Sequence, residues 1–173
     1  VGPEGVGGGN TDEAKAIEMA KRAKALGMKV LVDFHYSDFW VDPGQQKKPD
    51  AWKNDSGDKL VDDVYAYTAK VMQDFNAQGV TPDMVQVGNE LNNGMLWPEA
   101  QLTEDNPNGY KFLAKLLNAG LQAVHDNDKD NKVKTMIHLA GVDVNLYHTF
   151  FDNLIVKNKV NDFDIIGMSF YPF

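Results

Sequence analysis

Residues 84–90 read MVQVGNE, a short apolar run that ends in Gly88, Asn89 and Glu90. Its hydrophobic residues lack a helical period, and runs of this kind are typical of strands buried in a parallel sheet. A parallel strand that ends in Asn-Glu carries both side chains to the C-terminal edge of its sheet. Active sites of α/β proteins lie at that edge, so this stretch bears on the fold and on the site together.

Outward from this stretch, helical and strand patterns alternate along the chain. We predict four strands, at residues 28–34, 84–87, 133–140 and 163–169. Each follows a predicted helix, and the four helices span residues 11–26, 60–75, 110–124 and 146–155. Asn10 or Thr11 is expected to cap the first helix, and Gly27 to end it. The strict alternation predicts right-handed crossovers and a parallel sheet in one domain, residues 1–173.

Two architectures fit this alternation, a doubly wound sheet and part of a (β/α)8 barrel. The two longest loops, residues 35–56 and 90–108, both follow strand C-termini, as the functional loops of either fold do. No glycine-rich phosphate loop follows any predicted strand, which argues against a nucleotide site. An eight-stranded barrel usually takes about 250 residues, so a barrel would place further βα units outside residues 1–173, on both sides.

The composition narrows the class of partner. A formal net charge of −8 argues against nucleic acid and anionic membrane surfaces, and it suits a neutral ligand such as a sugar. No apolar run is long enough to span a membrane, and no signal-peptide pattern opens the sequence. The absence of cysteine excludes disulfides and thiolate metal sites, and we expect neither a cofactor nor a bound metal.

Polar side chains gather where the predicted strands end. Glu90 is the candidate general acid, because a carboxyl group at the partly buried mouth of a sheet stays protonated more readily than in water. From spacing alone, a loop carboxylate with a local structural role is an equal alternative. His35 and His138, taken singly, are better explained as core histidines, but together beside Glu90 they favour a site. His125, at the end of the third helix, is interpreted as structural.

The three tryptophans, Trp40, Trp52 and Trp97, all fall in the two long loops. An indole in a polar loop can stack on the apolar C–H face of a sugar ring. Anchoring of the loop against the fold is an equal alternative, and for Trp52 it is the favoured one.

At these residues the chain resembles a known family, the arabinogalactan endo-β-1,4-galactanases of glycoside hydrolase family 53. The matching segments are GGGN at residues 7–10, VDFHYSDFWVDPGQQKKPDAW at 32–52, MVQVGNELNNGMLWP at 84–98 and GMSFYPF at 167–173. With the helices between them, the resemblance covers essentially the whole chain, and the second and third segments are long and specific.

The resemblance implies a (β/α)8 barrel of clan A, of which these residues would hold about the third to sixth strands, and retention of anomeric configuration. It assigns the acid/base to Glu90, which follows Asn89, and puts the nucleophilic Glu on the seventh strand, outside residues 1–173. These residues alone are therefore expected to be inactive. Asn89 would bind the sugar 2-hydroxyl, and Tyr171 would face the nucleophile. The remaining residues implied to line the cleft are His35, Asp38, Trp40, Trp97 and His138.

The partner implied is a β-1,4-galactan oligosaccharide or polysaccharide, and the parent protein would be secreted, periplasmic or at the cell surface. Two other readings are a non-catalytic glycan-binding barrel and another clan A hydrolase, such as a mannanase or xylanase. The Asn-Glu pair argues against the first, and the DFHYSD and LWP segments argue against the second. A nucleotide-binding doubly wound protein is a further alternative. It is disfavoured because this sequence has no glycine-rich phosphate loop after a predicted strand.

Overall fold

The structure is a computed structural model that describes residues 11–172, so the GGGN segment and Phe173 lie outside the described residues. The α-helices are α1 (Glu13–Ala25), α2 (Gly57–Ala77), α3 (Gly109–Asp126) and α4 (Val144–Phe151). The strands are β1 (Leu31–Phe34), β2 (Met84–Val87), β3 (Gly94–Met95), β4 (Ala100–Gln101), β5 (Lys134–Ala140) and β6 (Ile165–Ser169). Shorter helical turns are η1 (Asp50–Trp52), η2 (Leu91–Asn93) and η3 (Asp152–Lys157).

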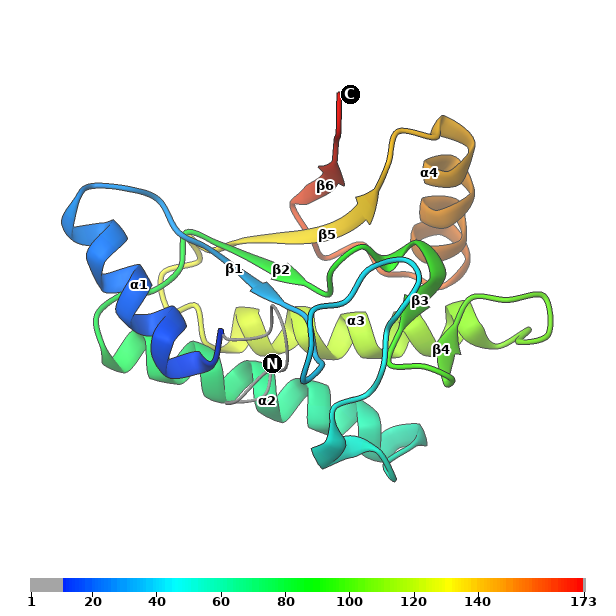
Figure 1. Ribbon diagram of the computed structural model, residues 1–173, viewed down its shortest axis with the longest axis horizontal. Helices are drawn as coiled ribbons and strands as arrows, with labels where there is room; N and C mark the ends of the chain where they lie inside the picture. Colours follow the sequence, from blue (N-terminus) through cyan, green and yellow to red (C-terminus); the bar gives the residue numbers. More distant parts are fainter. Residues whose placement is uncertain (1–10, 173) are drawn as a thin grey trace.

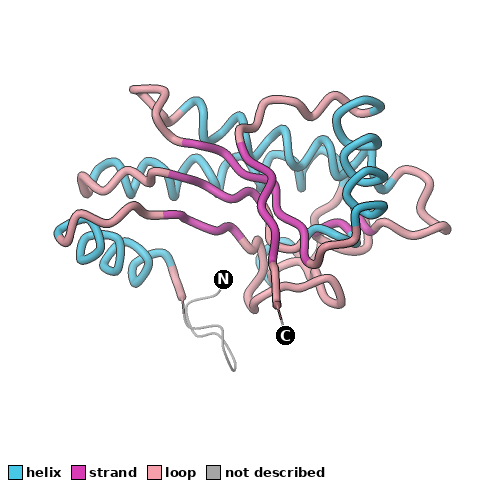
Figure 2. Tube along the Cα trace, turned by 90° about the horizontal axis from the view of Figure 1, so that it is seen from above, coloured by secondary structure: helices cyan, strands magenta, loops and turns pink. Residues whose placement is uncertain are grey.

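Four strands form one parallel sheet in the order β1-β2-β5-β6. Each predicted strand lies beside its neighbour in sequence, with no strand inserted and every pair parallel. This confirms the predicted parallel sheet and strand order, which agree with a central part of a (β/α)8 barrel. Helices α2 and α3 run along one face of the sheet, while α1 lies beyond the β1 edge (Figures 1 and 2).

The helix ends follow from local sequence. The side chain of Asp12 caps α1, since its Oδ1 accepts from the N–H of Lys15 at 2.8 Å, so the prediction that Thr11 would cap this helix is wrong. Asn10, the other predicted cap, lies outside the described residues. Gly27 ends α1 with a φ of 75°, as predicted, because glycine adopts this left-handed conformation without a steric cost.

The core lies between the sheet and helices α2 and α3. Its largest fully buried members on these helices are Phe75, Leu60, Met72, Leu113, Leu116, Leu117 and Leu121. They cover Val85 and Val87 of β2, both fully buried. β2 is therefore an inner strand with one face packed against these helices, which support the start of the turn that follows it.

The prediction that residues 28–34 form a strand buried on both faces is wrong. Met28 is 59% exposed and Leu31 is 42% exposed, because β1 is an edge strand and only its helix-facing side is covered. β6 is the other edge, and its Ile166 and Met168 are 51% and 50% exposed. Apolar side chains therefore lie open along both edges of the sheet.

Two local features differ from the sequence prediction. The loop after β2 contains a short antiparallel ribbon, in which Gly94 pairs with Gln101 and Met95 with Ala100. The predicted helix at 146–155 is divided, since α4 ends at Phe151 and η3 continues as a π-helical turn. Over residues 11–172, no helix combines the length and apolar character needed to cross a membrane.

Candidate active site

Glu90 lies at the C-terminal end of β2, half-buried, in an unusual backbone conformation. Its φ of 49° and ψ of 57° are left-handed, which costs a residue with a β-carbon about 1–3 kcal/mol. Gly88 begins this turn with a φ of 82°, and a β-carbon there would lie 2.7 Å from Cδ2 of Leu91. The turn is thus specified by Gly88 and fixed by packing, and it directs Glu90 across the end of the sheet.

The carboxylate of Glu90 is held by residues from the next two strands. The hydroxyl of Ser169, at the end of β6, donates to Oε1 of Glu90 at 2.7 Å. The same Oγ lies 2.9 Å from Nε2 of His138 on β5. The backbone N–H of Glu90 donates to Nδ1 of the same imidazole at 3.1 Å. His138 therefore contacts the main chain of Glu90 directly and its side chain through Ser169.

His138 is buried, and burial lowers its pKa from the ordinary value of 6.5. The negative charges of Asp33 and Glu90 oppose that shift, and the neighbouring His35 adds to it. The imidazole is therefore neutral at neutral pH, with one nitrogen as donor and the other as acceptor.

Asn89 is part of the same network. Its Oδ1 accepts from Nε2 of Gln86 at 3.1 Å and lies 2.9 Å from Nδ1 of His138. Its Nδ2 donates to the carbonyl oxygen of Val41 at 2.8 Å, which ties it to the loop after β1. The orientation of the Asn89 amide is thus set on both sides.

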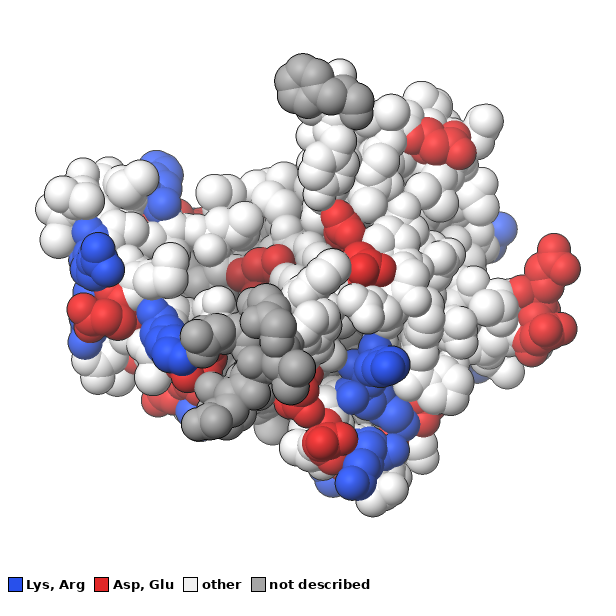
Figure 3. Space-filling view, viewed as in Figure 1, with Lys and Arg blue, Asp and Glu red and all other residues white. Residues whose placement is uncertain are grey.

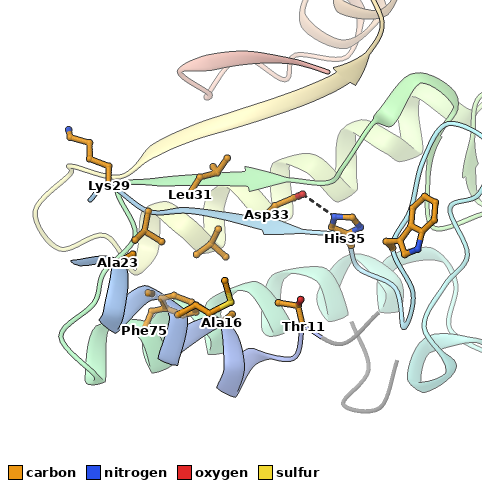
Figure 4. Close-up of a pocket in the computed structure, with 13 residues that line it drawn as sticks. Thr11, Ala16, Ala23, Lys29, Leu31, Asp33, His35 and Phe75 are labelled. Atoms are coloured by element: carbon orange, nitrogen blue, oxygen red, sulfur yellow. Dashed lines mark hydrogen bonds and ion pairs between the residues drawn. The ribbon is translucent and has the colours of Figure 1, made fainter. Parts of the chain in front are cut away.

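Gln86 extends the network to β1. Its Nε2 donates to Oδ1 of Asp33 at 2.7 Å, and Oδ2 of Asp33 lies 3.0 Å from Nε2 of His35 (Figure 4). The backbone N–H of Val41 donates to Nδ1 of His35 at 3.0 Å, so Nε2 of that ring carries the proton that Asp33 accepts. These hydrogen bonds join side chains at the ends of β1 and β2, and the main-chain N–H of Glu90 continues the network to His138 and Ser169.

The two long loops are fastened to each other beneath Glu90. Buried Gln46 donates through Nε2 to the carbonyl oxygens of Asn89 and Glu90, at 2.8 and 3.3 Å. The main-chain carbonyl oxygen of Gln46 accepts from the backbone N–H of Trp97 at 2.8 Å. Lys48 forms a mostly buried ion pair with Glu99 at 2.8 Å. These contacts support the turn that presents Glu90.

The structure brings four of the predicted site residues together, namely Glu90, Asn89, His35 and His138. The others lie outside this network. Asp38 accepts from the backbone N–H of Asp50 at 2.6 Å, which is a loop contact. Trp40 is 45% exposed and Tyr171 is 78% exposed.

The three tryptophans differ in their surroundings. The indole N–H of Trp97 donates to the carbonyl oxygen of Asn93 at 2.9 Å, which leaves its ring half-buried. Trp52 packs against Tyr36 and Tyr67, with ring centroids 6.3 and 5.9 Å apart, so it is a loop anchor. Tyr36 is buried, and burial raises the pKa of its hydroxyl. His125 lies in the last turn of α3, 3.5 Å from Asp162, which agrees with a structural role.

Four residues of the network were not singled out from the sequence. Asp33 and Gln86 had a signal, because each is a polar residue within an otherwise apolar strand. Ser169 is the last residue of the predicted strand at 163–169 and has no further signal, and nothing in the sequence distinguishes Gln46 from the other polar residues of its loop.

The charged side chains of the face seen in Figure 3 are of both signs, and acidic and basic ones lie close together along its left and lower parts. Within residues 11–172, no group of three or more His, Asp or Glu side chains is arranged to hold a metal ion. The arrangement is that of an oxygen-rich, hydrogen-bonding surface around one half-buried carboxylate.

Comparison with known proteins gives consistent matches. The family described as Glycosyl hydrolase family 53 matches residues 2–173. Endo-beta-1,4-galactanase of Bacillus subtilis (strain 168) is 41% identical over 169 residues, covering 98% of this chain and 37% of that protein. A probable arabinogalactan endo-beta-1,4-galactanase A of Neosartorya fischeri is 38% identical over 161 residues, covering 91% and 44%.

A solved structure agrees with these sequence matches. The Ignisphaera aggregans GH53 catalytic domain has a TM-score of 0.86 and 43% identity, over 96% of this chain and 44% of that one. The chain thus spans less than half the length of each of these proteins.

Proposed function

Because the chain belongs to glycosyl hydrolase family 53, we propose that the protein containing it hydrolyses β-1,4-galactan or arabinogalactan, with Glu90 as the acid/base. The observation that carries this proposal is the position of Glu90. It is a half-buried carboxylate at the mouth of a parallel sheet, held in a left-handed turn and hydrogen-bonded to the ends of the next two strands. Strain of this kind, maintained by surrounding contacts, is typical of functional sites.

In the proposed reaction Glu90 acts twice. It first donates its proton to the glycosidic oxygen as the bond from that oxygen to C1 breaks, and a second carboxylate forms a bond to C1. Water then attacks C1, Glu90 takes a proton from that water, and the bond to the second carboxylate breaks. Two inversions at C1 give net retention, and the mechanism requires the two carboxyl groups about 5–5.5 Å apart. We propose that the second carboxylate comes from a strand outside residues 1–173.

The sugar-binding roles follow from where the side chains lie. Asn89 has an amide fixed by Gln86 and Val41, which suits it to orient the 2-hydroxyl of the sugar under attack. Trp40 is exposed in the loop that begins at His35, and its ring is available for stacking on a pyranose. Asp38, Trp97 and Tyr171 are proposed to line the same cleft farther from Glu90.

The direct test uses the complete purified protein and three polysaccharides, β-1,4-galactan, β-1,4-mannan and β-1,4-xylan. We expect oligosaccharide products from galactan alone, and ¹H NMR of the first products should show the β-anomer. Binding of galactan without cleavage would replace the enzyme proposal with a glycan-binding one. Cleavage of mannan or xylan in place of galactan would refute the substrate, and an α-anomer first product would refute retention.

We also propose that the protein acts outside the cytoplasm, because an intact polysaccharide does not cross a membrane. Cell fractionation followed by detection of the protein tests this. Recovery of the native protein only in the cytoplasm would contradict it.

A further inference from the structure

We propose that Ser169 is a positioning residue that decides which oxygen of Glu90 handles the catalytic proton. Its hydroxyl, oriented by His138, occupies Oε1 in both protonation states of Glu90, so the proton is delivered and collected by Oε2. This inference rests on the proposed role of Glu90 as acid/base, and it adds a residue that contacts the carboxylate rather than the sugar.

The argument begins with the tautomer of His138. The backbone N–H of Glu90 points at Nδ1 of this ring at 3.1 Å, and a main-chain N–H cannot rotate away. A proton on Nδ1 would leave that N–H facing another hydrogen, at an unfavourable cost for a half-buried donor. Nδ1 is therefore the acceptor, and Nε2 carries the proton.

One contact favours the opposite tautomer and has to be weighed. Oδ1 of Asn89 lies 2.9 Å from Nδ1 of His138, a distance that would suit a donor on Nδ1. With Nδ1 unprotonated, Oδ1 and Nδ1 are two acceptors 2.9 Å apart, an unfavourable contact, although Oδ1 keeps its hydrogen bond from Nε2 of Gln86 at 3.1 Å. With Nδ1 protonated, the N–H of Glu90, which has no other acceptor among the described residues, would face a hydrogen. Nε2 of His138 and Oε1 of Glu90 would then also compete for the single hydroxyl proton of Ser169, so the contacts together assign the proton to Nε2.

The direction of the next two hydrogen bonds then follows. With its proton on Nε2, His138 donates to Oγ of Ser169 at 2.9 Å. Ser169 has a single hydroxyl proton, which is free to point at Oε1 of Glu90 at 2.7 Å. The side chain of Ser169 is thus an acceptor from His138 of β5 and a donor to Glu90, in the turn after β2.

The consequence for Glu90 concerns both of its protonation states. As an anion it accepts at Oε1, and as an acid it can still accept at Oε1 if the proton is on Oε2. A proton on Oε1 would face the hydroxyl hydrogen of Ser169. Oε2 is therefore the oxygen that exchanges the proton with the glycosidic oxygen and with water, and the carboxyl group keeps one rotamer through both steps.

Other titratable groups lie near His138 and Ser169, and a test of Ser169 must leave their interactions unchanged. Asp33 and His35, from β1 and the residues after it, and Glu90 itself are the charged or titratable groups that act on His138. Asp33 and His35 are paired with each other at 3.0 Å and do not contact Ser169 in the hydrogen bonds described above. Replacement of Ser169 should therefore leave their interaction unchanged.

The experiment compares the complete protein with its Ser169→Ala, Ser169→Thr and Ser56→Ala variants. Ser56 is the matched control, since it is exposed and makes no side-chain capping hydrogen bond. In Ser169→Ala the anion of Glu90 loses a donor. We expect the basic limb of the kcat/KM profile to move up by about one pH unit and kcat to fall roughly tenfold or more. Ser169→Thr should restore most of both, and Ser56→Ala should match wild type.

Two readouts separate this inference from the proposed function. ¹⁵N NMR of the labelled imidazole reports the tautomer, and we expect the proton on Nε2 of His138. The ¹³C chemical shift of the Glu90 carboxyl, assigned through its absence in Glu90→Gln, should differ between Ser169→Ala and wild type, because Oε1 loses its donor. A proton on Nδ1, or an unmoved pH limb and an unchanged Glu90 carboxyl shift in Ser169→Ala, would overturn the inference. Wild-type protein without galactan turnover would instead refute the proposed function, while the NMR results still test the hydrogen-bond chain.

Discussion

Gly120 of α3 packs directly against Val87 of β2. A β-carbon at position 120 would lie 2.6 Å from Cγ1 of Val87, which is closer than side chains in proteins approach. Val87 is the last residue of β2, so this contact fixes the distance between α3 and the start of the Gly88-Asn89-Glu90 turn. A glycine inside a helix, normally unfavourable, is required here by the closeness of helix and strand.

Gly120→Ala is therefore expected to destabilise the protein although alanine favours helix by about 1 kcal/mol. Overpacking a filled core typically costs about 1–3 kcal/mol, and we expect a net loss within that range in denaturant unfolding. Asn118→Ala is the control, because this position is exposed on the same helix and gains propensity without a packing conflict. Equal stabilisation by both substitutions would show that the contact with Val87 relaxes freely.

Glu90→Gln should lower galactan hydrolysis by roughly 10²–10⁴-fold, because glutamine keeps the shape of the side chain and cannot transfer the proton. An activated aryl galactoside needs little protonation of its leaving group, so its covalent intermediate should accumulate. Azide needs no general base, and it should restore turnover and give a β-azide product. Near-normal activity of Glu90→Gln on galactan would make Glu90 a structural carboxylate.

Asn89→Ala provides the contrast to that experiment. Its proposed role is to hold the 2-hydroxyl, so it should lose activity that azide does not restore. Loss of the 2.8 Å hydrogen bond to Val41 should also loosen the loop after β1, measurable as faster hydrogen exchange there. Rescue by azide would assign Asn89 to proton transfer instead.

Trp40 and Trp52 should separate binding from stability. Trp40→Ala removes an exposed ring, and we expect the KM for galactan to rise about threefold to tenfold with the melting temperature unchanged. Trp52→Ala opens the cluster with Tyr36 and Tyr67, and we expect a loss of stability of about 3 kcal/mol. Reversed effects would mean that Trp52 meets the sugar and Trp40 anchors the loop.

His138 should make stability depend on pH in one direction. Burial lowers its pKa in the folded state below the ordinary value of 6.5, so the unfolded chain binds the proton more readily. The stability gained by burying the neutral imidazole is fully present above pH 6.5, and it is lost as the pH falls through the folded-state pKa of His138. Replacement by Gln should flatten the unfolding free energy across that range. An unchanged slope in His138→Gln would assign the pH dependence to other groups.

Residues 1–173 produced alone should neither hydrolyse galactan nor stay monomeric. Both edges of the sheet, β1 and β6, carry exposed apolar side chains such as Leu31 and Ile166. Open edges of this kind pair with other chains. Size-exclusion chromatography and a galactanase assay test this directly. A monomeric, active product would mean that the second carboxylate lies within these residues.

Much of the fold could be predicted from the sequence because its signals are local. Alternating helix and strand patterns identified every strand of the main sheet, and the loop lengths indicated the functional edge. The β3–β4 ribbon could not be predicted, since its two-residue strands are too short to show a period. The π-helical turn after Phe151 is likewise a matter of backbone register, which side-chain spacing does not reveal.

The site was harder to predict than the fold, because its contacts join residues far apart in sequence. Glu90, Asn89, His35 and His138 could be proposed from strand ends and from the resemblance to a family. The contact of Ser169 with Glu90 depends on the register of β5 against β6, in which His138 pairs with Gly167. Sequence patterns predict that two strands are neighbours, but they do not give this register.

The strand order β1-β2-β5-β6 also bears on how the protein is made. Each strand of this sheet pairs only with the strands of the same sheet that precede and follow it in the chain, so a polypeptide leaving the ribosome can add one βα unit at a time. His138 and Gly167 pair across a shorter stretch of chain than Asp33 and Gln86, and closing the shorter loop costs less entropy. When the complete chain refolds from the unfolded state, nucleation at β5–β6 is therefore favoured over nucleation at β1–β2. The Ser169–His138 contact that orients Glu90 would then belong to the earliest part of the sheet to form.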